Sequence, residues 1–539
     1  MIKSQIKKIF IVFICIFVLS TIALARRETP LANDGISGLY ARSIEQVLRL
    51  RENEVDLATA VLIVSENWSD MVYGRRYLSR LDDMAREIRE RLREKKIPTN
   101  YRAIPVINEY LFEELRFTSL SEATDPNSLF LHTVLDKKEG YCLSLSVLYL
   151  SIAERLGLDM YGVVVPGHFF VRYDDGHERF NIETTSKGGV ASDEEYIKKF
   201  NVPEGRRDSI YMKNLNKIQT LGCFFNNLGN SYNDVGNIDQ AFLALKRAVE
   251  INPTLSESHA NLGNIYLTKG QSNLAKNEYL TALNINPDDA KTHNNLGNAY
   301  TEQGLLSRAI SEYLKAINLD PNFVDAYKNI SIAYFKQERY TLAISRLNQA
   351  LDLKTDDIGC YMQLGEIYHE KGEYKKAIDQ YKKVLKIKPD YAEAYYGMGI
   401  CYNKLDSVDN EILAYLNALT IEPNMFSALV NLGNVYFEQK KFTLAIKQYK
   451  KAALIQPDEA MIYYNLGAAY SNNNNYEEAT NSYLKVVELS PDNGDAHYGL
   501  AYGFYNQKKY ELAWKHIKKA QELGVDVGDD LLKAIKSKL

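Results

Sequence analysis

Cysteine is scarce in this sequence, with five residues among 539, and an excess of charge of one sign is lacking. The four cysteines beyond the N-terminal segment are too few and too dispersed to define a disulfide framework. Lys and Arg total 65 against 69 Asp and Glu, so the net charge of −4 gives no basis for binding nucleic acid or an anionic membrane surface. The composition is otherwise that of a globular protein, and the length requires at least two domains.

Cofactor motifs are also lacking. The sequence contains no phosphate-binding loop and no glycine-rich fingerprint for a nucleotide. His132 and His177 do not have the spacing of metal ligands with Cys142. We therefore expect neither a cofactor nor a metal site.

The first 25 residues have the pattern of an export signal. Lys3, Lys7 and Lys8 precede an uncharged run over residues 9–25 that ends in Ala23-Leu24-Ala25. This pattern predicts a signal peptide cleaved after Ala25, followed by a linker over residues 26–38. The alternative is an uncleaved membrane anchor, because the run reaches the lower end of spanning length. Both interpretations predict an exported protein, periplasmic or extracellular, that contacts the membrane only through a retained anchor.

Residues 222–527 repeat with a period of 34 residues and form nine blocks without an insertion. The second block, residues 256–289, shows the pattern in Leu262, Gly263, Tyr266, Ala275, Tyr279, Ala282 and Pro287. Small residues let two helices approach closely, tyrosines fill the space between units, and the proline ends the second helix. The pattern resembles the tetratricopeptide repeat (TPR), which implies an all-α superhelical solenoid. Residues 528–539 have the amphipathic pattern of a helix that caps the last repeat.

Carboxamide side chains recur at the sixth position of the repeat, and we call this series the carboxamide ladder. Its members are Asn227, Asn261, Asn295, Asn329, Gln363, Asn431 and Asn465. First helices line the inner surface of such a solenoid, so the ladder should donate to and accept from the backbone of an extended peptide. It resembles the asparagine ladder in the TPR arm of intracellular O-GlcNAc transferases, although the glycosyltransferase domain of that family is absent. A second interpretation is that the ladder only records recent duplication.

Upstream of the repeats, residues 39–125 have a helical pattern, and a cysteine then stands at the start of a further predicted helix. Cys142 follows Gly140-Tyr141 and opens an apolar segment that ends at Gly157. The dipole and unpaired amides of a helix N-terminus stabilise a thiolate and can bind an oxyanion. This position suits a nucleophile.

A histidine and a glutamate follow on two predicted strands. His168 and Glu183 are equidistant from a hairpin turn centred between Asp175 and Gly176. They should face each other across the hairpin, so that the carboxylate orients the imidazole.

These segments resemble the bacterial transglutaminase-like core family, relatives of papain-type cysteine hydrolases. The resemblance rests on Gly-Tyr-Cys at a helix start, Pro-Gly-His-Phe entering a strand and Glu-Thr-Thr leaving the next. It implies an α+β domain over residues 39–200, joined to the repeats by a linker over residues 201–221. It also implies that Cys142 is the nucleophile, His168 the general base and then acid, and Glu183 the orienting group. The third residue is Glu here where Asp is commoner in the family.

The sequence thus predicts an exported transglutaminase-like cysteine hydrolase or acyltransferase that acts on amide bonds of peptides or proteins. The repeat array would bind proteins or extended peptides through its concave face. The alternative is a non-catalytic TPR scaffold or assembly factor of the cell envelope, in which the transglutaminase-like domain is degenerate.

Overall fold

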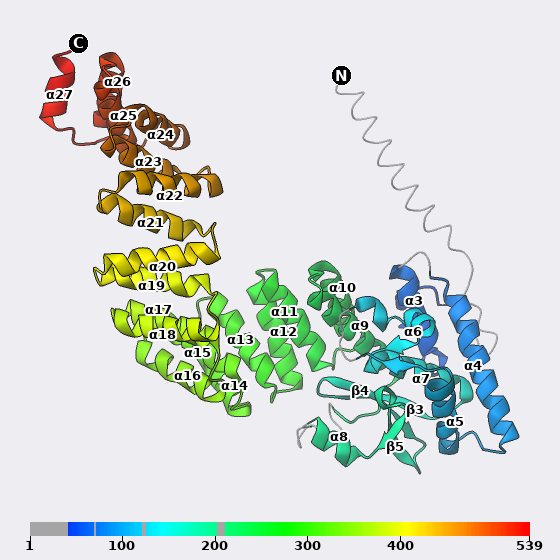
Figure 1. Cartoon of the computed structure of the whole chain (residues 1–539). Helices are drawn as coiled ribbons and strands as arrows, with labels where there is room; N and C mark the ends of the chain where they lie inside the picture. Colours follow the sequence, from blue (N-terminus) through cyan, green and yellow to red (C-terminus); the bar gives the residue numbers. More distant parts are fainter. Residues whose placement is uncertain (1–40, 69–71, 121–124, 201, 203–210) are drawn as a thin grey trace, which may run out of the picture. The chain divides into compact units, whose positions relative to one another are not determined.

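The computed structural model describes residues 41–68, 72–120, 125–200, 202 and 211–539, which form two compact units that divide between Pro321 and Asn322. The predicted signal segment at residues 1–25 and the linker at 26–38 lie outside the described residues. Among the helices that are described, none is long and apolar enough to cross a membrane. The expected fold class is confirmed, because a small α/β region is followed by a long series of paired helices (Figure 1).

The N-terminal helices pack around a central helix, α7. In chain order they are α2 (Ile44–Val47), α3 (Leu57–Trp68), α4 (Gly74–Glu94), α5 (Ile104–Asn108), α6 (Leu131–Lys137) and α7 (Cys142–Leu156). Thirteen of the fifteen α7 residues are buried, including Arg155, which is neutralised by Asp82 at 2.6 Å and Asp56 at 3.3 Å. Because α7 is enclosed along its length, the position of its first residue is fixed.

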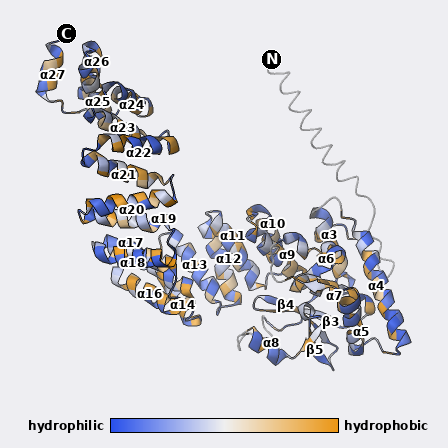
Figure 2. Ribbon diagram, viewed as in Figure 1, coloured by the Kyte–Doolittle hydropathy of each residue, from blue (hydrophilic) through white to orange (hydrophobic). Residues whose placement is uncertain are grey.

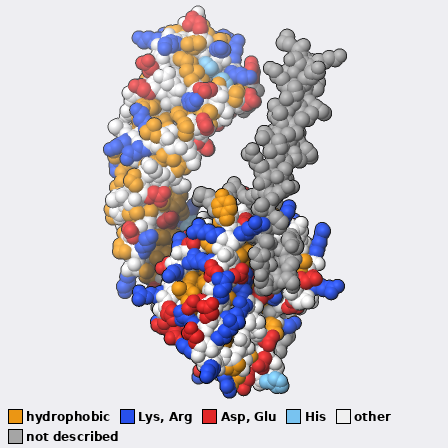
Figure 3. Space-filling view, turned by 90° about the vertical axis from the view of Figure 1, so that its right-hand side faces the viewer, with side chains coloured by type: hydrophobic (Ala, Val, Ile, Leu, Met, Phe, Trp, Pro, Cys, Tyr) orange, Lys and Arg blue, Asp and Glu red, His pale blue; other side chains and the backbone are white. Residues whose placement is uncertain are grey.

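Helix α4 carries charges of both signs. Arg91 Nε bonds to Glu87 Oε1 at 2.8 Å, and Arg86 Nη1 bonds to Asp83 Oδ1 at the same distance. Figure 3 shows acidic and basic side chains intermixed on the face that it presents. Local pairing of this kind is typical of a solvated helix face rather than a polyanion-binding patch.

Four antiparallel strands follow α7 in the order β3 (Met160–Val165), β4 (His168–Asp174), β5 (Arg179–Glu183) and β6 (Gly189–Ala191). Helix α8 (Asp193–Lys199) comes next, and two short strands, β1 (Thr118–Ser119) and β2 (Glu139–Gly140), pair in parallel. Alternation along the strands places Val171 and Ile182 in the main core with α7, and Phe170 in a smaller cluster with Tyr196 of α8. The sheet therefore contributes one face to each of two apolar clusters.

The β4–β5 hairpin has a different register from the expected one. Asp174 pairs with Arg179, so the loop spans residues 175–178 and its centre lies one residue later than the sequence suggested. The Asp175 carboxylate accepts two backbone N–H groups of the loop, at 2.9 and 2.8 Å, and this stabilises the longer turn. In this register Glu183 lies diagonally across from His168 rather than directly opposite, on the same face of the sheet.

The repeat helices form antiparallel pairs in both units. The first unit contains α9 (Lys217–Asp234), α10 (Ile238–Ile251), α11 (Ser256–Thr268), α12 (Ser272–Ile285), α13 (Ala290–Glu302) and α14 (Leu306–Leu319). The second contains α15 (Val324–Lys336), α16 (Tyr340–Leu353), α17 (Ile358–Glu370), α18 (Tyr374–Ile387), α19 (Ala392–Lys404), α20 (Val408–Ile421), α21 (Phe426–Glu438), α22 (Phe442–Ile455), α23 (Ala460–Asn472), α24 (Tyr476–Leu489), α25 (Gly494–Asn506), α26 (Tyr510–Glu522) and α27 (Asp529–Lys536). Figure 2 shows hydrophobic and hydrophilic residues mixed along these helices, as amphipathic helices require.

A glycine–tyrosine contact joins the two helices of many repeats. A Cβ atom on Gly433 would lie 2.5 Å from Tyr449 Cε1, and one on Gly263 would lie 2.6 Å from Tyr279 Cε1. The tyrosine hydroxyl then donates to the asparagine that directly follows the glycine, as Tyr449 does to Asn434 at 2.7 Å. Only glycine admits the aromatic ring at this distance, which explains its recurrence in the sequence.

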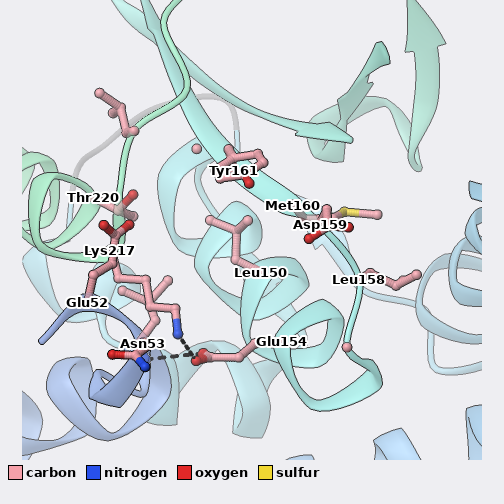
Figure 4. Close-up of a pocket in the computed structure, with 14 residues that line it drawn as sticks. Glu52, Asn53, Leu150, Glu154, Leu158, Asp159, Met160, Tyr161, Lys217 and Thr220 are labelled. Carbon is pink, nitrogen blue, oxygen red and sulfur yellow. Dashed lines mark hydrogen bonds and ion pairs between the residues drawn. The ribbon is translucent and has the colours of Figure 1, made fainter. Parts of the chain in front are cut away.

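Helix α9 begins at Lys217, inside the segment that the sequence suggested as a linker, and it packs into the N-terminal domain. The Phe224 ring lies 6.1 Å from the Phe130 ring, between centroids. Figure 4 shows the Lys217 ammonium beside the Glu154 carboxylate of α7, in a pocket of about 620 Å³, and Lys217 also donates to the Val55 carbonyl at 2.6 Å. The first repeat and the N-terminal domain therefore share one hydrophobic core.

Candidate active site

Cys142 is the first residue of α7, where the sequence placed it. Tyr141 precedes the helix in an extended conformation, and its backbone N–H donates to Ser144 Oγ at 2.8 Å. A Cβ atom on Gly140 would lie 2.7 Å from that same hydroxyl, so the sharp entry to the helix needs a glycine. The Cys142 side chain is half-buried at the helix N-terminus, where the first backbone N–H groups have no acceptor within the helix.

His168 is the first residue of β4, and its ring is held from two sides. Nε2 lies 2.7 Å from Glu183 Oε2. The ring stacks on Phe200 at the end of α8, with 4.7 Å between centroids and 8° between planes. Because Nε2 is bonded to the carboxylate, Nδ1 is the ring nitrogen left for the Cys142 side chain, which lines the same cleft.

The Glu183 carboxylate is fixed by four donors. Oε1 accepts the Thr185 backbone N–H at 3.2 Å and the Thr185 hydroxyl at 2.6 Å. Oε2 accepts the Tyr196 hydroxyl at 3.0 Å in addition to the bond with His168. A glutamate therefore reaches the imidazole here, and its position at the end of β5 is held by neighbours on both oxygens.

Hydrogen bonding sets the charge of this pair. Burial by itself would lower the pKa of His168, but hydrogen bonds with Cys142 and Glu183, and their charges, raise it to about 9. Burial would raise the pKa of Glu183, but the bond with His168, its charge and the two bonds from Thr185 lower it to about 2. At neutral pH the imidazole is therefore in its protonated form beside the Cys142 sulfur, with a carboxylate behind it.

The other cysteines of the described chain lie in different surroundings. Cys223, Cys360 and Cys401 are free and fully buried. Burial raises the pKa of Cys360 and of Cys401 to about 12, and raises that of Cys223 further. Within the described ranges, no group of three or more His, Cys, Asp or Glu side chains is arranged to hold a metal ion.

A cleft of about 420 Å³ opens beside Cys142 and His168, and the first repeats form its opposite wall. Its lining includes Asn226, Asn227 and Asn230 of α9, Asn261 and Asn264 of α11, and Asn295 of α13. All of these residues belong to the first unit. Catalytic candidates and repeat asparagines thus lie on one continuous surface.

Three of the seven ladder residues line this cleft, namely Asn227, Asn261 and Asn295. The others, Asn329, Gln363, Asn431 and Asn465, lie in the second unit, and all seven are half-buried.

Ladder side chains also bond to neighbouring repeats, which the sequence did not indicate. Asn261 Nδ2 donates to Asn226 Oδ1 at 3.0 Å, and Asn295 Nδ2 donates to Asn264 Oδ1 at 2.9 Å. Asn227 differs, because its Nδ2 donates to the Cys223 carbonyl of its own helix at 3.0 Å. Part of the hydrogen-bonding capacity of the ladder therefore joins one repeat to the next.

Sequence reasoning missed Tyr196 and Phe200, which hold the carboxylate and the imidazole. Both lie on or next to α8, more than ten residues after Glu183, and no local spacing relates them to the strands. Thr185 carried a weak signal, because it belongs to the Glu-Thr-Thr segment that closes β5.

Comparison with known proteins agrees with the division of the chain into a transglutaminase-like domain and a repeat array. Residues 75–222 match the family described as the transglutaminase-like superfamily, and TPR families match residues 229–406 and 433–493. A "UPF0162 protein" of Xylella fastidiosa is 31% identical over 126 residues, which are 22% of this chain and 43% of that protein. Mouse (Mus musculus) "F-box only protein 21" is 31% identical over 84 residues, or 15% of this chain and 13% of that protein. The chain thus spans less than half the length of these relatives.

Among solved structures, the repeats are similar to a crystal structure of MamA. The identity is 31%, the TM-score is 0.29, and the match covers 30% of this chain and 95% of that one. TPR arrays present extended surfaces for protein partners, which supports a protein-interaction role for the repeats. The family matches and the observed fold together establish that the chain joins a transglutaminase-like domain to an array of tetratricopeptide repeats.

Proposed function

We propose that the N-terminal domain is a cysteine hydrolase or acyltransferase that acts on amide bonds of peptides or proteins, and that the TPR array binds its partners. The observation that carries the proposal is the His168 imidazole, which is bonded to the Glu183 carboxylate and lines the same cleft as Cys142. A nucleophile and a base in one cleft, with an orienting group bonded to the base, are the elements that acyl transfer requires.

Each side chain would have one task in the reaction. The Cys142 sulfur, having given its proton to His168, attacks the substrate carbonyl, and the backbone N–H groups at the start of α7 bind the oxyanion. The His168 imidazolium then donates that proton to the leaving amine, which leaves a thioester on Cys142. His168 next removes a proton from water or from a second amine, whose attack on the thioester releases the acid or a new amide.

Export is a further part of the proposal. The sequence of residues 1–25 supports it through three lysines followed by an uncharged run. Fractionation of cells that produce the full chain, with protease treatment of intact spheroplasts, tests this. Protection of the chain inside the spheroplasts would contradict export.

A thiol-reactive probe tests the nucleophile without knowledge of the substrate. We expect iodoacetamide at pH 7 to alkylate Cys142 much faster than the three buried cysteines, with His168→Ala slowing Cys142 alkylation by about ten-fold or more. His177→Ala is the matched control, because His177 is exposed in the β4–β5 loop. Mass spectrometry of the Cys142 peptide gives both rates.

An equal alkylation rate in His168→Ala would refute a functional cysteine–histidine pair. It would favour the alternative, a non-catalytic scaffold with a degenerate domain. Turnover is measured separately with β-casein and a fluorescent primary amine, because amine incorporation reports acyl transfer and new chain ends report hydrolysis. If wild-type protein forms neither product at a concentration at which casein binds, the proposed activity is also contradicted.

A further inference from the structure

We propose that the first repeats belong to the active site, and that the segment to be processed lies along their asparagines as an extended polypeptide whose reactive carbonyl reaches Cys142. This inference rests on the proposed function and adds the form of the substrate and the residues that hold it. The inference is based on one cleft that is lined by Cys142 and His168 on one side and by repeat asparagines on the other.

The two sides of this cleft are fixed relative to each other. Helix α9, which supplies Asn227 and Asn230, packs through Phe224 against Phe130 of the N-terminal domain and bonds through Lys217 to α7. One hydrophobic core includes buried residues of the N-terminal domain, such as Phe130, and buried residues of α9 and α11, such as Phe224 and Ile265. A chain held by the asparagines would therefore meet Cys142 at a constant distance, without domain closure.

The two carboxylates that line the cleft are engaged in other bonds, and Lys291 adds an ammonium to the lining. Glu257 accepts the Tyr211 hydroxyl at 3.0 Å, and Asp289 accepts the Lys291 backbone N–H at 3.0 Å as the cap of α13. Carboxamides are therefore the main groups left for a ligand, and each combines donors with an acceptor, as a peptide backbone does. The cleft therefore suits a polypeptide backbone.

The spacing of the repeats sets the length of the bound segment. The first helices of neighbouring repeats lie about 10 Å apart. The three ladder side chains Asn227, Asn261 and Asn295 therefore span about 20 Å. An extended chain advances about 3.3 Å per residue, so a bound segment of about six residues reaches from Asn227 to Asn295. Short amides that reach only Cys142 would lack this contact.

Protection of Cys142 from alkylation tests the inference. The full chain is treated with iodoacetamide with and without β-casein, which serves as an extended polypeptide, and Cys142 modification is measured by mass spectrometry. We expect casein to slow alkylation of Cys142. The double variant Asn227→Ala and Asn230→Ala should need at least about five-fold more casein for the same protection.

Two comparisons isolate the role of these asparagines. Asn277→Ala removes an exposed carboxamide from α12 of the first unit, outside the lining of the cleft, and should leave the casein requirement unchanged. Asn227→Gln keeps a carboxamide and should lose less protection than Asn227→Ala. Unchanged alkylation without casein, and an unchanged unfolding temperature, would show that the double variant is folded.

The inference is overturned if casein binds without slowing alkylation, if it gives no protection at any concentration, or if the double variant is protected as well as wild type. The experiment needs binding but not turnover, so it is independent of the proposed activity. If His168→Ala alkylates normally while casein still protects Cys142 through the asparagines, the proposed chemistry fails and the binding cleft stands.

Discussion

Replacing Glu183 by Gln should lower the pKa of His168 without changing the geometry of the site. The pKa of His168 lies at about 9, roughly 2.5 pH units above its ordinary value, which is equivalent to about 3 kcal/mol. The hydrogen-bonded Glu183 carboxylate is one of the two neighbours that raise it, and Gln keeps the size but not the charge. We expect the pKa of His168 to fall by at least about one pH unit, or about 1.4 kcal/mol.

The pH titration of the His168 ring, followed by NMR in protein with isotope-labelled histidine, measures this pKa directly. The signal is assigned by its loss in His168→Ala. Tyr196→Phe is the matched control, because it removes another hydrogen bond to the same carboxylate oxygen but keeps the charge, so the pKa of His168 should not fall. A pKa unchanged in Glu183→Gln would refute the coupling on which the proposed mechanism depends.

Three further predictions concern stability. Gly433→Ala should destabilise the chain by about 1–3 kcal/mol, measured by thermal unfolding, because the new methyl group meets the Tyr449 ring. Glu411→Ala should stabilise it, because burial raises the pKa of this carboxyl, and the gain should grow as pH rises above about 4.5, where the unfolded chain ionises first. His516→Gln should lessen acid sensitivity, because burial and the charge of His497 lower the pKa of His516 to about 4, so wild-type stability falls as pH drops from about 6.5 to 4.

Each of these three stability predictions has an outcome that would contradict it. Unfolding of Gly433→Ala at the wild-type temperature would mean that the ring moves aside at little cost. A gain in Glu411→Ala that is equal at pH 4 and pH 8 would remove ionisation as its cause. Parallel acid unfolding curves for His516→Gln and wild type would mean that other groups set the acid limit.

The repeat array could be predicted almost completely, because its information is local. A glycine and a tyrosine sixteen residues apart are in contact in Gly263–Tyr279 and in Gly433–Tyr449, so the period in the sequence is also the period of packing. The internal bonds of the ladder could not be predicted, because the side-chain amide of Asn261 can be satisfied by a peptide or by Asn226. Only the spacing between repeats decides between these partners.

The candidate site was predictable in its residues but not in its geometry. Cys142, His168 and Glu183 followed from motif order and strand pattern, whereas the hairpin register depends on how the Asp175 side chain bonds within the loop. The supporting side chain of Tyr196 comes from α8, which folds back over the sheet. Contacts of that kind depend on tertiary packing, which has no periodic signature in the sequence.

The shared core of the N-terminal domain and α9 limits how this protein can be divided. A fragment that ends just before α9 would expose the Phe130 side chain to water and leave the Glu154 carboxylate without Lys217. We expect such a fragment to aggregate, and one that retains α9 and α10 to remain soluble. Whole repeats could be gained or lost at the far end of the array during evolution, but the first repeat would have to be inherited together with the N-terminal domain.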